Sequence, residues 1–298
     1  MNESLVYIVI LNWNGWRDTV ECIESCRSLT YPNFRIVIVD NGSSDGSEAI
    51  LRERCPDAEL IQTGDNLGFA GGNNIGIRQA LEHGADYVWL LNNDTIVDAG
   101  ALTALVQAAE SDKSVGMAGS KIVYYDNPKL LWYAGAFLDS ARPCRPAHRG
   151  LGEEDKGQYD APEETGYVTG CSLLARCGMM ETVGLLDEGF FLYFEDVEWS
   201  ARARRAGWRL VYAPASVVRH KESVTTGGAA SPTVVYYTAR NRLYFVQRHF
   251  PRKFAQALVY DLYEHVAVNI KKRRFPAAIS AWHGIWDFFR GRTGEKGR

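Results

Sequence analysis

The sequence lacks the features that mark secreted, membrane-spanning or zinc-binding proteins. Its six cysteines form no CxxC pair and no regular framework, which predicts reduced thiols in a cytoplasmic protein rather than disulfides or zinc ligands. The first residues contain no basic leader, so we expect no secretory signal. No apolar run reaches the length of a bilayer span, because charged residues such as those at 271–274 interrupt the candidates. Any membrane contact is therefore expected to be peripheral, at the inner face of the plasma membrane.

Charge is distributed unevenly along the 298 residues. Residues 236–298 contain thirteen Lys and Arg against four Asp and Glu, a balance of +9, and the net charge of −3 leaves −12 for residues 1–235. A nucleic-acid enzyme usually carries its basic surface on the main domain, so this pattern argues against a nucleic-acid partner. A basic tail on an acidic body instead favours contact with anionic phosphates or lipid headgroups.

The N-terminal third alternates apolar runs with amphipathic stretches, which predicts an α/β fold. Apolar runs without polar alternation are typical of parallel strands covered on both faces, and such strands deliver their last residues to one edge of the sheet. The expected strands cover 6–11, 34–40, 58–63 and 86–92, and the expected helices cover 16–29, 44–54, 70–83 and 99–110.

The rest of the chain continues this pattern with one interruption. A further strand is expected at 115–124, and 127–165 is a poorly periodic, proline-containing excursion over the active face. We divide the chain into a catalytic domain at 1–235 and a helical, basic and aromatic extension at 236–298. Within the domain, 1–125 is expected to bind a nucleotide and 126–235 an acceptor.

Polar residues follow several of these strands. Asn92, Asn93 and Asp94 end the run DYVWLLNND, where their oxygens are suited to a divalent cation with a diphosphate. A simple Asn-rich turn is the alternative for an isolated NND. Asp40 ends another strand in VDNGSSDGS, where it either accepts from a pyrimidine imide N–H or belongs to an ordinary capped loop. Asn12 closes the first strand.

Two further segments carry candidate site residues. NLGFAGGNN, residues 66–74, matches neither GxGxxG nor a Walker A loop, but its glycines are expected to open a helix whose free N–H groups approach a base or ribose. FFLYFEDVEW contains Glu195, Asp196 and Glu198. Adjacent carboxylates in apolar surroundings favour a raised pKa and general-base chemistry, which we assign to Asp196, whereas Glu198 fits the acidic first turn of a helix.

Together these motifs resemble glycosyltransferase family 2, the inverting GT-A enzymes, and especially its bacterial rhamnosyltransferase-like branch. The resemblance extends to about residue 250 and rests on VILNWNG, VDNGSSDGS, NLGFAGGNN, LLNNDT, GFFLYFEDVEW, ARRAGW, RH at 219–220 and YYTARNRLYF. It implies a GT-A fold, that is, a Rossmann-like, mostly parallel sheet flanked by helices, here with a C-terminal helical extension. The resemblance also implies that the protein takes part in cell-surface polysaccharide synthesis.

The resemblance implies a role for each candidate residue. Asp196 is the base that deprotonates the acceptor hydroxyl, while Asp94 and His220 hold a metal. These roles require Asp94 and Asp196 to lie close together around one donor. The acceptor side is expected to include Thr169, Gly170, Trp199 and Glu195, although Trp199, one turn along a helix, fits a core position equally well. The donor, a dTDP- or UDP-sugar, is expected to contact Asn12, Asp40, Asn66, Gly68, Gly72, Asn73, Asn92 and Asn93.

One departure from the family pattern concerns the metal site. The first acid of the usual DXD motif is Asn92 here, and a neutral amide binds cations more weakly than a carboxylate. We therefore expect modest affinity for Mg²⁺ or Mn²⁺, with the donor diphosphate supplying most ligands. The branch often uses dTDP-rhamnose, so L-rhamnose is the first expectation, with a glycan or polyprenyl-diphosphate-linked glycan as acceptor.

Two other functions were weighed against glycosyl transfer. A sugar-phosphate nucleotidyltransferase would carry a glycine-rich, basic loop after its first strand, where this chain has NWNGW. A non-catalytic nucleotide-sugar-binding protein would have no need for both Asp94 and Asp196, although their presence does not exclude it.

The tail combines KKRRF at 271–275 with Trp282, Ile285, Trp286 and Phe289 at helical spacing. Such a stripe is typical of a packing or homodimer face, and the neighbouring basic cluster also favours peripheral membrane contact through 271–298. Deletion of these residues is expected to lower liposome binding if the membrane interpretation is correct.

Overall fold

The computed structural model describes residues 3–139, 142, 144–221 and 231–297 and has the predicted α/β architecture. Ten strands form one sheet in the order β10-β12-β6-β11-β4-β1-β2-β3, with β5 beside β12 and β7 beside β6, and β8 and β9 pair separately. The strands are β1 (Val6–Asn12), β2 (Phe34–Asp40), β3 (Glu59–Gln62), β4 (Tyr87–Asn92), β5 (Thr95–Val97), β6 (Val115–Tyr124), β7 (Leu131–Tyr133), β8 (Ala136–Asp139), β9 (Arg145–His148), β10 (Glu163–Glu164), β11 (Ser172–Arg176) and β12 (Arg209–His220).

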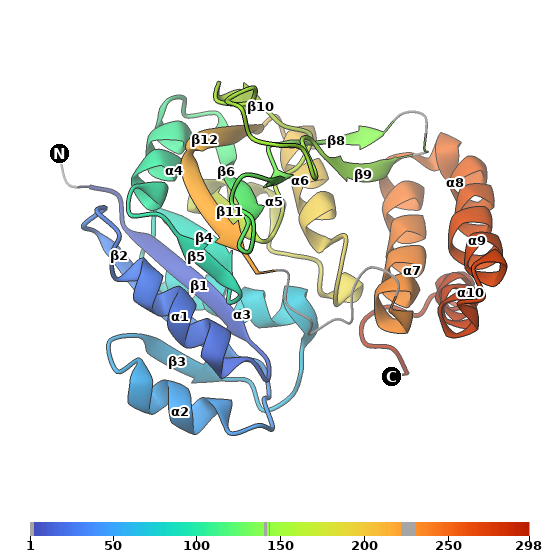
Figure 1. Cartoon of the computed structure of the whole chain (residues 1–298), viewed down its shortest axis with the longest axis horizontal. Coiled ribbons are helices and arrows are strands. Elements are labelled where there is room, and N and C mark those ends of the chain that lie inside the picture. The colour runs from blue at the N-terminus through green and yellow to red at the C-terminus, as the bar shows by residue number, and fades with distance from the viewer. Residues whose placement is uncertain (1–2, 140–141, 143, 222–230, 298) are drawn as a thin grey trace.

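Helices cover both faces of the sheet (Figure 1). Alternate residues of β1 enter two different cores, since successive side chains of a strand point to opposite faces. Ile8 and Ile10 pack with residues of α1, α2 and α4, whereas Tyr7 and Val9 pack with residues of α3, α5 and α6. The helices are α1 (Trp16–Cys26), α2 (Ser47–Arg54), α3 (Gly68–Glu82), α4 (Ala101–Glu110), α5 (Cys177–Val183), α6 (Glu195–Arg205), α7 (Pro232–His249), α8 (Phe254–Asp261), α9 (Val268–Lys271) and α10 (Phe275–Phe289).

The first half of the sheet is parallel and the second is mixed. β3, β2, β1 and β4 run in the same direction, with Asn12 opposite Asp40 and Leu11 opposite Asn92. β11 then enters antiparallel between β4 and β6, and β12 runs parallel to β6. The aligned strand ends bring the predicted polar residues to one edge, and the β11 insertion adds residues 169–171 beside them.

The excursion predicted at 127–165 contains more structure than its sequence pattern indicates. In its described part, β7 pairs with the main sheet, β8 and β9 form a hairpin, and β10 pairs with β12. These strands are two to four residues long, too short for a hydrophobic period to be recognisable in the sequence. Residues 140–141 and 143 lie outside the described residues.

The C-terminal helices gather beside the sheet (Figure 1). The predicted boundary between residues 235 and 236 falls inside α7. Phe245 and Val246 of this helix are fully buried in the main core, and its opposite face packs with α10. A π-helical segment, Leu262–Ala267, joins α8 to α9. The extension is therefore packed against the sheet domain through α7.

All six cysteines are buried free thiols, as the sequence predicts. Across the described residues, no helix has both the length and the hydropathy needed to cross a bilayer.

Candidate functional site

Asp40 lies at the centre of a buried hydrogen-bond network at the sheet edge. Its Oδ1 accepts from Asn12 Nδ2 at 2.7 Å and Ser43 Oγ at 2.5 Å, and its Oδ2 accepts from Gln62 Nε2 at 2.6 Å. Asn12 is equally buried, and its Oδ1 accepts from Thr19 Oγ1. Both predicted donor-binding residues thus join the ends of neighbouring strands, and their contact with a nucleotide stays a prediction.

The start of α3 corrects the expectation of free N–H groups. The N–H groups of Phe69 and Ala70 both donate to the carbonyl oxygen of Phe191, at 2.6 and 3.3 Å, and the Gly68 N–H donates to Asn66 Oδ1. Because these groups already have protein partners, the helix N-terminus is not an open cradle for an anion. Gly68 has a φ of +72°, and a Cβ there would lie 2.4 Å from the Phe191 carbonyl oxygen, so glycine is required for this contact.

Gly72 and Asn73 also have packing contacts. A Cβ on Gly72 would lie 2.4 Å from Leu11 Cδ1, so glycine lets α3 approach β1 closely. Asn73 is buried and its Nδ2 donates to the Phe69 carbonyl of the same helix. Close helix packing is a sufficient reason for the glycine, and donor binding by either residue is untested by the structure.

The NND turn separates its three side chains. Asn93 Nδ2 donates to Thr19 Oγ1 at 3.0 Å, which ties the turn to α1. Asn92 is half-buried at the end of β4, and its N–H donates to the Cys171 carbonyl. Asp94 is buried and lies on the opposite side of the turn, toward β12.

Asp94 and His220 meet because the short strand β5 pairs with the end of β12. This pairing places Thr95 opposite His220, and the Lys221 N–H donates to the Asp94 carbonyl. His220 Nε2 consequently lies 3.3 Å from Asp94 Oδ1, with both side chains about nine-tenths buried. The predicted pair is therefore brought together by two segments that are more than a hundred residues apart in the sequence.

An aromatic residue and a second histidine surround His220. The Trp132 ring contacts both the His220 and His148 rings edge-on, with centroids 4.7 and 4.5 Å apart. Burial lowers the pKa of His148 to about 4, so it is neutral at physiological pH and adds no positive charge beside His220. Sequence reasoning missed both residues because they lie in the excursion that showed no periodic pattern.

Asp196, the predicted base, is held by backbone donors at the start of α6. Its Oδ2 accepts from the Gly170 N–H at 2.9 Å and its Oδ1 from the Val197 N–H at 2.7 Å. Burial raises the pKa of Asp196 above its ordinary value despite these hydrogen bonds. Burial, followed by the charge of Asp196, also raises the pKa of Glu195 well above its ordinary value.

Asp94 and Asp196 are connected through the segment before β11. Gly170 donates to Asp196, and the next residue, Cys171, accepts from the Asn92 N–H two positions before Asp94. Burial raises the pKa of the Cys171 thiol first, and the charges of Asp94 and Asp196 both raise it further. The hydrogen bonds of the adjacent residues 170 and 171 therefore link the start of α6, with Asp196, to the turn that holds Asp94.

Two of the predicted acceptor residues adjoin Asp196, and a third does not reach the site. Thr169 is buried beside Gly170, in the segment that contacts Asp196. Trp199, in contrast, is fully buried among the core residues of α3, α5 and β11, and its Nε1 donates to the Gly184 carbonyl. The assignment of Trp199 to acceptor binding was wrong, because one helical turn from Asp196 its ring points into the core.

Glu198 lies in the acidic first turn of α6, as the sequence predicts, and it also forms a buried cluster with three basic side chains. It is fully buried and accepts from Arg202, Arg248 and His249 at 2.7, 3.0 and 3.2 Å. Burial alone would raise its pKa, but the hydrogen bonds from these three side chains and the charge of Arg202 lower the pKa of Glu198 to about 2. The cluster joins α6 to the end of α7.

The loop before Asp196 is strained and is clamped from two sides. Phe191, Tyr193 and Phe194 have φ angles of 61°, 67° and 74°, a conformation unfavourable for bulky residues. Asn241 Nδ2 donates to the carbonyls of Phe190, Leu192 and Tyr193, each at 2.8 Å.

The second clamp contact comes from the neighbouring residue on α7. Arg240 Nη2 donates to the Phe190 carbonyl at 3.2 Å, and Arg240 and Asn241 are both fully buried. From the other side, the start of α3 donates to the Phe191 carbonyl. Sequence reasoning missed both residues, although two polar residues inside the apolar helix YYTARNRLYF are the available signal.

A family model described as "Glycosyl transferase family 2" matches residues 7–184. The chain belongs to this family. The match contains the NND turn, Gly170 and all of β1 but its first residue, whereas α6 with Asp196 begins eleven residues after its end.

Two curated proteins are similar along most of this chain. The N-acetylglucosaminyl-diphospho-decaprenol L-rhamnosyltransferase of Mycobacterium tuberculosis is 28% identical over 232 residues, 72% of this chain and 75% of the relative. The dTDP-rhamnosyl transferase RfbF of Shigella flexneri is 26% identical over 263 residues, 84% and 82% of the two chains.

The solved structure of GalNAc-T7 with UDP, GalNAc and Mn²⁺ superposes with a TM-score of 0.61 at 15% identity, covering 89% of this chain. This chain spans 58% of the length of that protein. At such low identity the likeness concerns the fold, and it agrees with the predicted GT-A architecture.

In the described part of the chain, the predicted metal site brings together two side chains that could bind a cation, Asp94 and His220. Within the described residues, no three His, Cys, Asp or Glu side chains gather as a metal site. The 3.3 Å between Asp94 Oδ1 and His220 Nε2 suits neighbouring ligands of one cation, because bonds of about 2.1 Å at right angles separate adjacent ligand atoms by about 3 Å. The pair therefore fits a cation that takes its other ligands from elsewhere.

Proposed function

We propose that this protein transfers a sugar from a nucleotide-diphosphate donor to a hydroxyl of a glycan or lipid-linked glycan during cell-surface polysaccharide synthesis, with inversion at the anomeric carbon. L-Rhamnose from dTDP-rhamnose is the first choice, since both curated relatives carry rhamnosyltransferase names. The observation that carries the proposal is a buried, backbone-held Asp196 joined through residues 170 and 171 to the Asp94–His220 pair.

Asp196 is suited to removing the acceptor proton. Its raised pKa makes it a better proton acceptor than an exposed aspartate, while the Gly170 and Val197 N–H groups hold its carboxylate in one orientation. The acceptor oxygen forms a bond to the anomeric carbon as the bond to the diphosphate oxygen breaks. The hydroxyl proton passes to Asp196, and the electron pair of the broken bond leaves with the diphosphate.

Asp94 and His220 would hold a divalent cation, Mg²⁺ or Mn²⁺, on the leaving-group side. When bound, such a cation neutralises charge that develops on the departing diphosphate. Asn92 stands where a second carboxylate would add charge, so we propose that the donor supplies most of the remaining ligands and that metal and donor bind together.

The test compares Asp196→Asn with the wild type, using dTDP-rhamnose and an N-acetylglucosaminyl-diphospho-polyprenol. We expect the variant to retain donor binding in calorimetry and to lose transfer by at least a thousandfold. Glu181→Gln, which changes an exposed carboxylate on α5, is the control and should keep full transfer. Undiminished transfer by Asp196→Asn would refute the assignment of the base.

The donor is tested separately from the chemistry. Thermal shifts with UDP-, dTDP- and GDP-sugars, with and without Mn²⁺, should rank dTDP-rhamnose first and show a larger shift when metal is present. A preference for another nucleotide sugar would overturn the choice of rhamnose and leave the role of Asp196 intact.

A further inference from the structure

The outer face of α10 carries an apolar stripe that the fold does not use. Phe275, Ile279, Trp282, Trp286 and Phe289 are each more than half exposed. At 100° per residue these five positions fall within an arc of about 80° on the helix. With aromatic side chains of 150–250 Å² each, half-exposure of the four rings alone presents roughly 400 Å² of apolar surface. This is a large patch for a monomeric protein.

The opposite face of α10 provides the packing contacts. Ala281, Ile285 and Phe288 are buried against α7, and a Cβ on Gly284 would lie 2.4 Å from the Tyr236 carbonyl oxygen. The four residues of the stripe predicted from the sequence therefore lie on two faces of α10. Ile285 is on the buried face, and Trp282, Trp286 and Phe289 are on the exposed face. Substitutions on the exposed face can be made without disturbing the bundle, whereas deleting 271–298 would remove the partner of α7.

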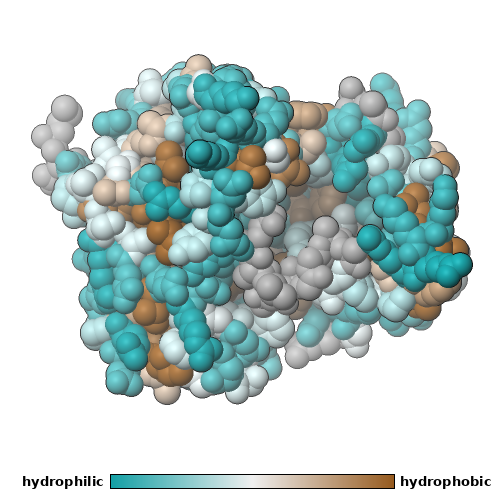
Figure 2. Space-filling view, in the orientation of Figure 1, coloured by the Kyte–Doolittle hydropathy of each residue, from teal (hydrophilic) through white to brown (hydrophobic). Residues whose placement is uncertain are grey.

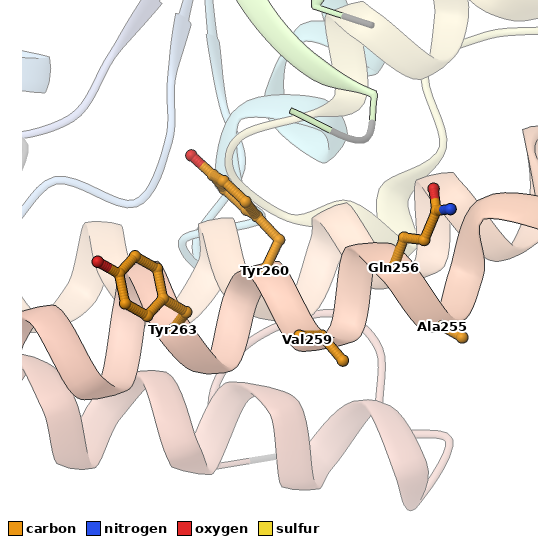
Figure 3. Close-up of a pocket in the computed structure, with 5 residues that line it drawn as sticks. All are labelled: Ala255, Gln256, Val259, Tyr260 and Tyr263. Carbon is orange, nitrogen blue, oxygen red and sulfur yellow. The ribbon is translucent and has the colours of Figure 1, made fainter. Parts of the chain in front are cut away.

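Neighbouring helices of the same bundle expose further apolar side chains. Val259 and Tyr263 are 67% and 63% exposed. With Ala255, Gln256 and Tyr260 they line a shallow pocket along α8 and the π-helical segment, which packs against α10 (Figure 3). In Figure 2 this end of the molecule shows hydrophobic atoms among strongly hydrophilic ones.

A basic cluster lies at the start of the stripe. Lys271, Lys272, Arg273 and Arg274 are all exposed, and none forms an ion pair with another residue in the described part of the chain. Residues 236–298 carry +9 while residues 1–235 carry −12. An anionic surface would thus attract this end of the molecule and repel the other, which orients the protein on it.

We propose that the outer stripe of α10 and the cluster 271–274 bind the anionic surface of a phospholipid bilayer. The tryptophan rings suit the boundary between headgroups and acyl chains, and the four cations suit anionic headgroups. A second copy of the chain fits less well, because it would bring another four cations to the contact and no matching acidic cluster. The proposal stands on this surface and is independent of the sugar transferred.

The test is flotation of the full-length protein with vesicles of phosphatidylcholine alone or with about 30% phosphatidylglycerol. One variant, Trp282→Ser with Trp286→Ser, removes apolar contact, and another, Lys272→Glu with Arg273→Glu, reverses charge. The matched controls are Leu151→Ser, an exposed apolar residue of the sheet domain, and Lys113→Glu with Lys129→Glu, two exposed cations of that domain. Circular dichroism checks that every variant is folded.

We expect the wild type to float only with anionic vesicles. Each cation near such a surface contributes about a fivefold gain in binding. The charge variant should therefore bind at least twentyfold more weakly, the tryptophan variant at least tenfold, and the controls like the wild type. The proposal would be overturned if the wild type did not float, or if both test variants floated as well as the wild type. It would also be overturned by sedimentation showing a wild-type dimer that the tryptophan variant converts to monomer without any vesicle binding.

Discussion

Replacing Asn241 by Ala is expected to release the loop that positions Asp196. Asn241 is fully buried, and its single amide nitrogen donates to three carbonyls of residues 190–193. Three nearby residues have positive φ angles, which persist only while the surroundings hold them. Removing the amide takes away its three contacts from α7 and leaves those of Arg240 and of the start of α3.

The expected magnitude follows from these contacts. The carbonyls of Leu192 and Tyr193 lose the Asn241 donor, whereas the Phe190 carbonyl keeps Arg240 and the Leu192 N–H as donors. At about 1 kcal/mol for each carbonyl left without its partner, the substitution should lower the free energy of unfolding by roughly 2 kcal/mol. The effect on transfer should be larger than this loss implies, because a displacement of about 1 Å at a catalytic group can lower the rate about a hundredfold. Donor binding should change less than transfer, because the pairing of β5 with β12, and not the loop, brings Asp94 to His220.

Urea denaturation measures the stability, and hydrogen exchange measures the loop. We expect faster exchange in peptides covering 188–197 and at the Phe69 and Ala70 amides, which donate to Phe191. Asn269→Ala is the matched control, because this buried asparagine donates to one carbonyl of its own helical segment. It should cost about 1 kcal/mol and leave the loop unchanged. Unchanged exchange at 188–197 in Asn241→Ala, with wild-type stability, would refute the clamp.

Three further predictions follow from the site and its supports. Glu198→Gln should lower stability at pH 7 by roughly 3 kcal/mol, the value of a pKa shift from 4.5 to about 2. Because the folded pKa is depressed, this difference should be present above pH 4.5 and should disappear in denaturation curves as pH falls toward 2. Trp199→Ala should lower the free energy of unfolding by roughly 3–5 kcal/mol, the usual cost of losing a core aromatic side chain, without a selective change in acceptor KM. The acid limb of the kcat/KM profile should lie above pH 3.8, because the raised pKa of Asp196 governs it, and a limb at or below 3.8 would contradict that role.

The first half of the fold was predictable because its strands are buried on both faces of the sheet. β1 and β2 are covered on both faces, so their residues form unbroken apolar runs, and the expected strands at 6–11 and 34–40 nearly coincide with the observed ones. The strand at 115–124 agrees in both bounds. Once these strands are parallel, the common position of their last residues follows from topology.

The site was less predictable because its geometry depends on short or irregular segments. β5 has three residues, yet its pairing with β12 is what joins Asp94 to His220. The orientation of Asp196 depends on the Gly170 N–H, which no side-chain pattern reveals.

Residue type alone gave an incomplete picture at three positions. Trp199 resembles a sugar platform but faces the core, while the glycine at position 72 gives no sign of the close packing of α3 against Leu11 that the structure shows. Asn241 was overlooked because a polar residue within a helix of the tail gave no indication that the helix packs under the site loop. Helix orientation and packing decide all three, and neither is encoded within a short motif.

A crystal structure of Asp196→Asn with dTDP-rhamnose and Mn²⁺ tests the central claim most directly, because the variant should hold the intact donor. We predict metal density between Asp94 and His220, the diphosphate beside it, and the anomeric carbon facing residue 196. A donor bound away from these residues, or one whose sugar lies with Asp94 and residue 196 on the same side of the anomeric carbon, would contradict the account.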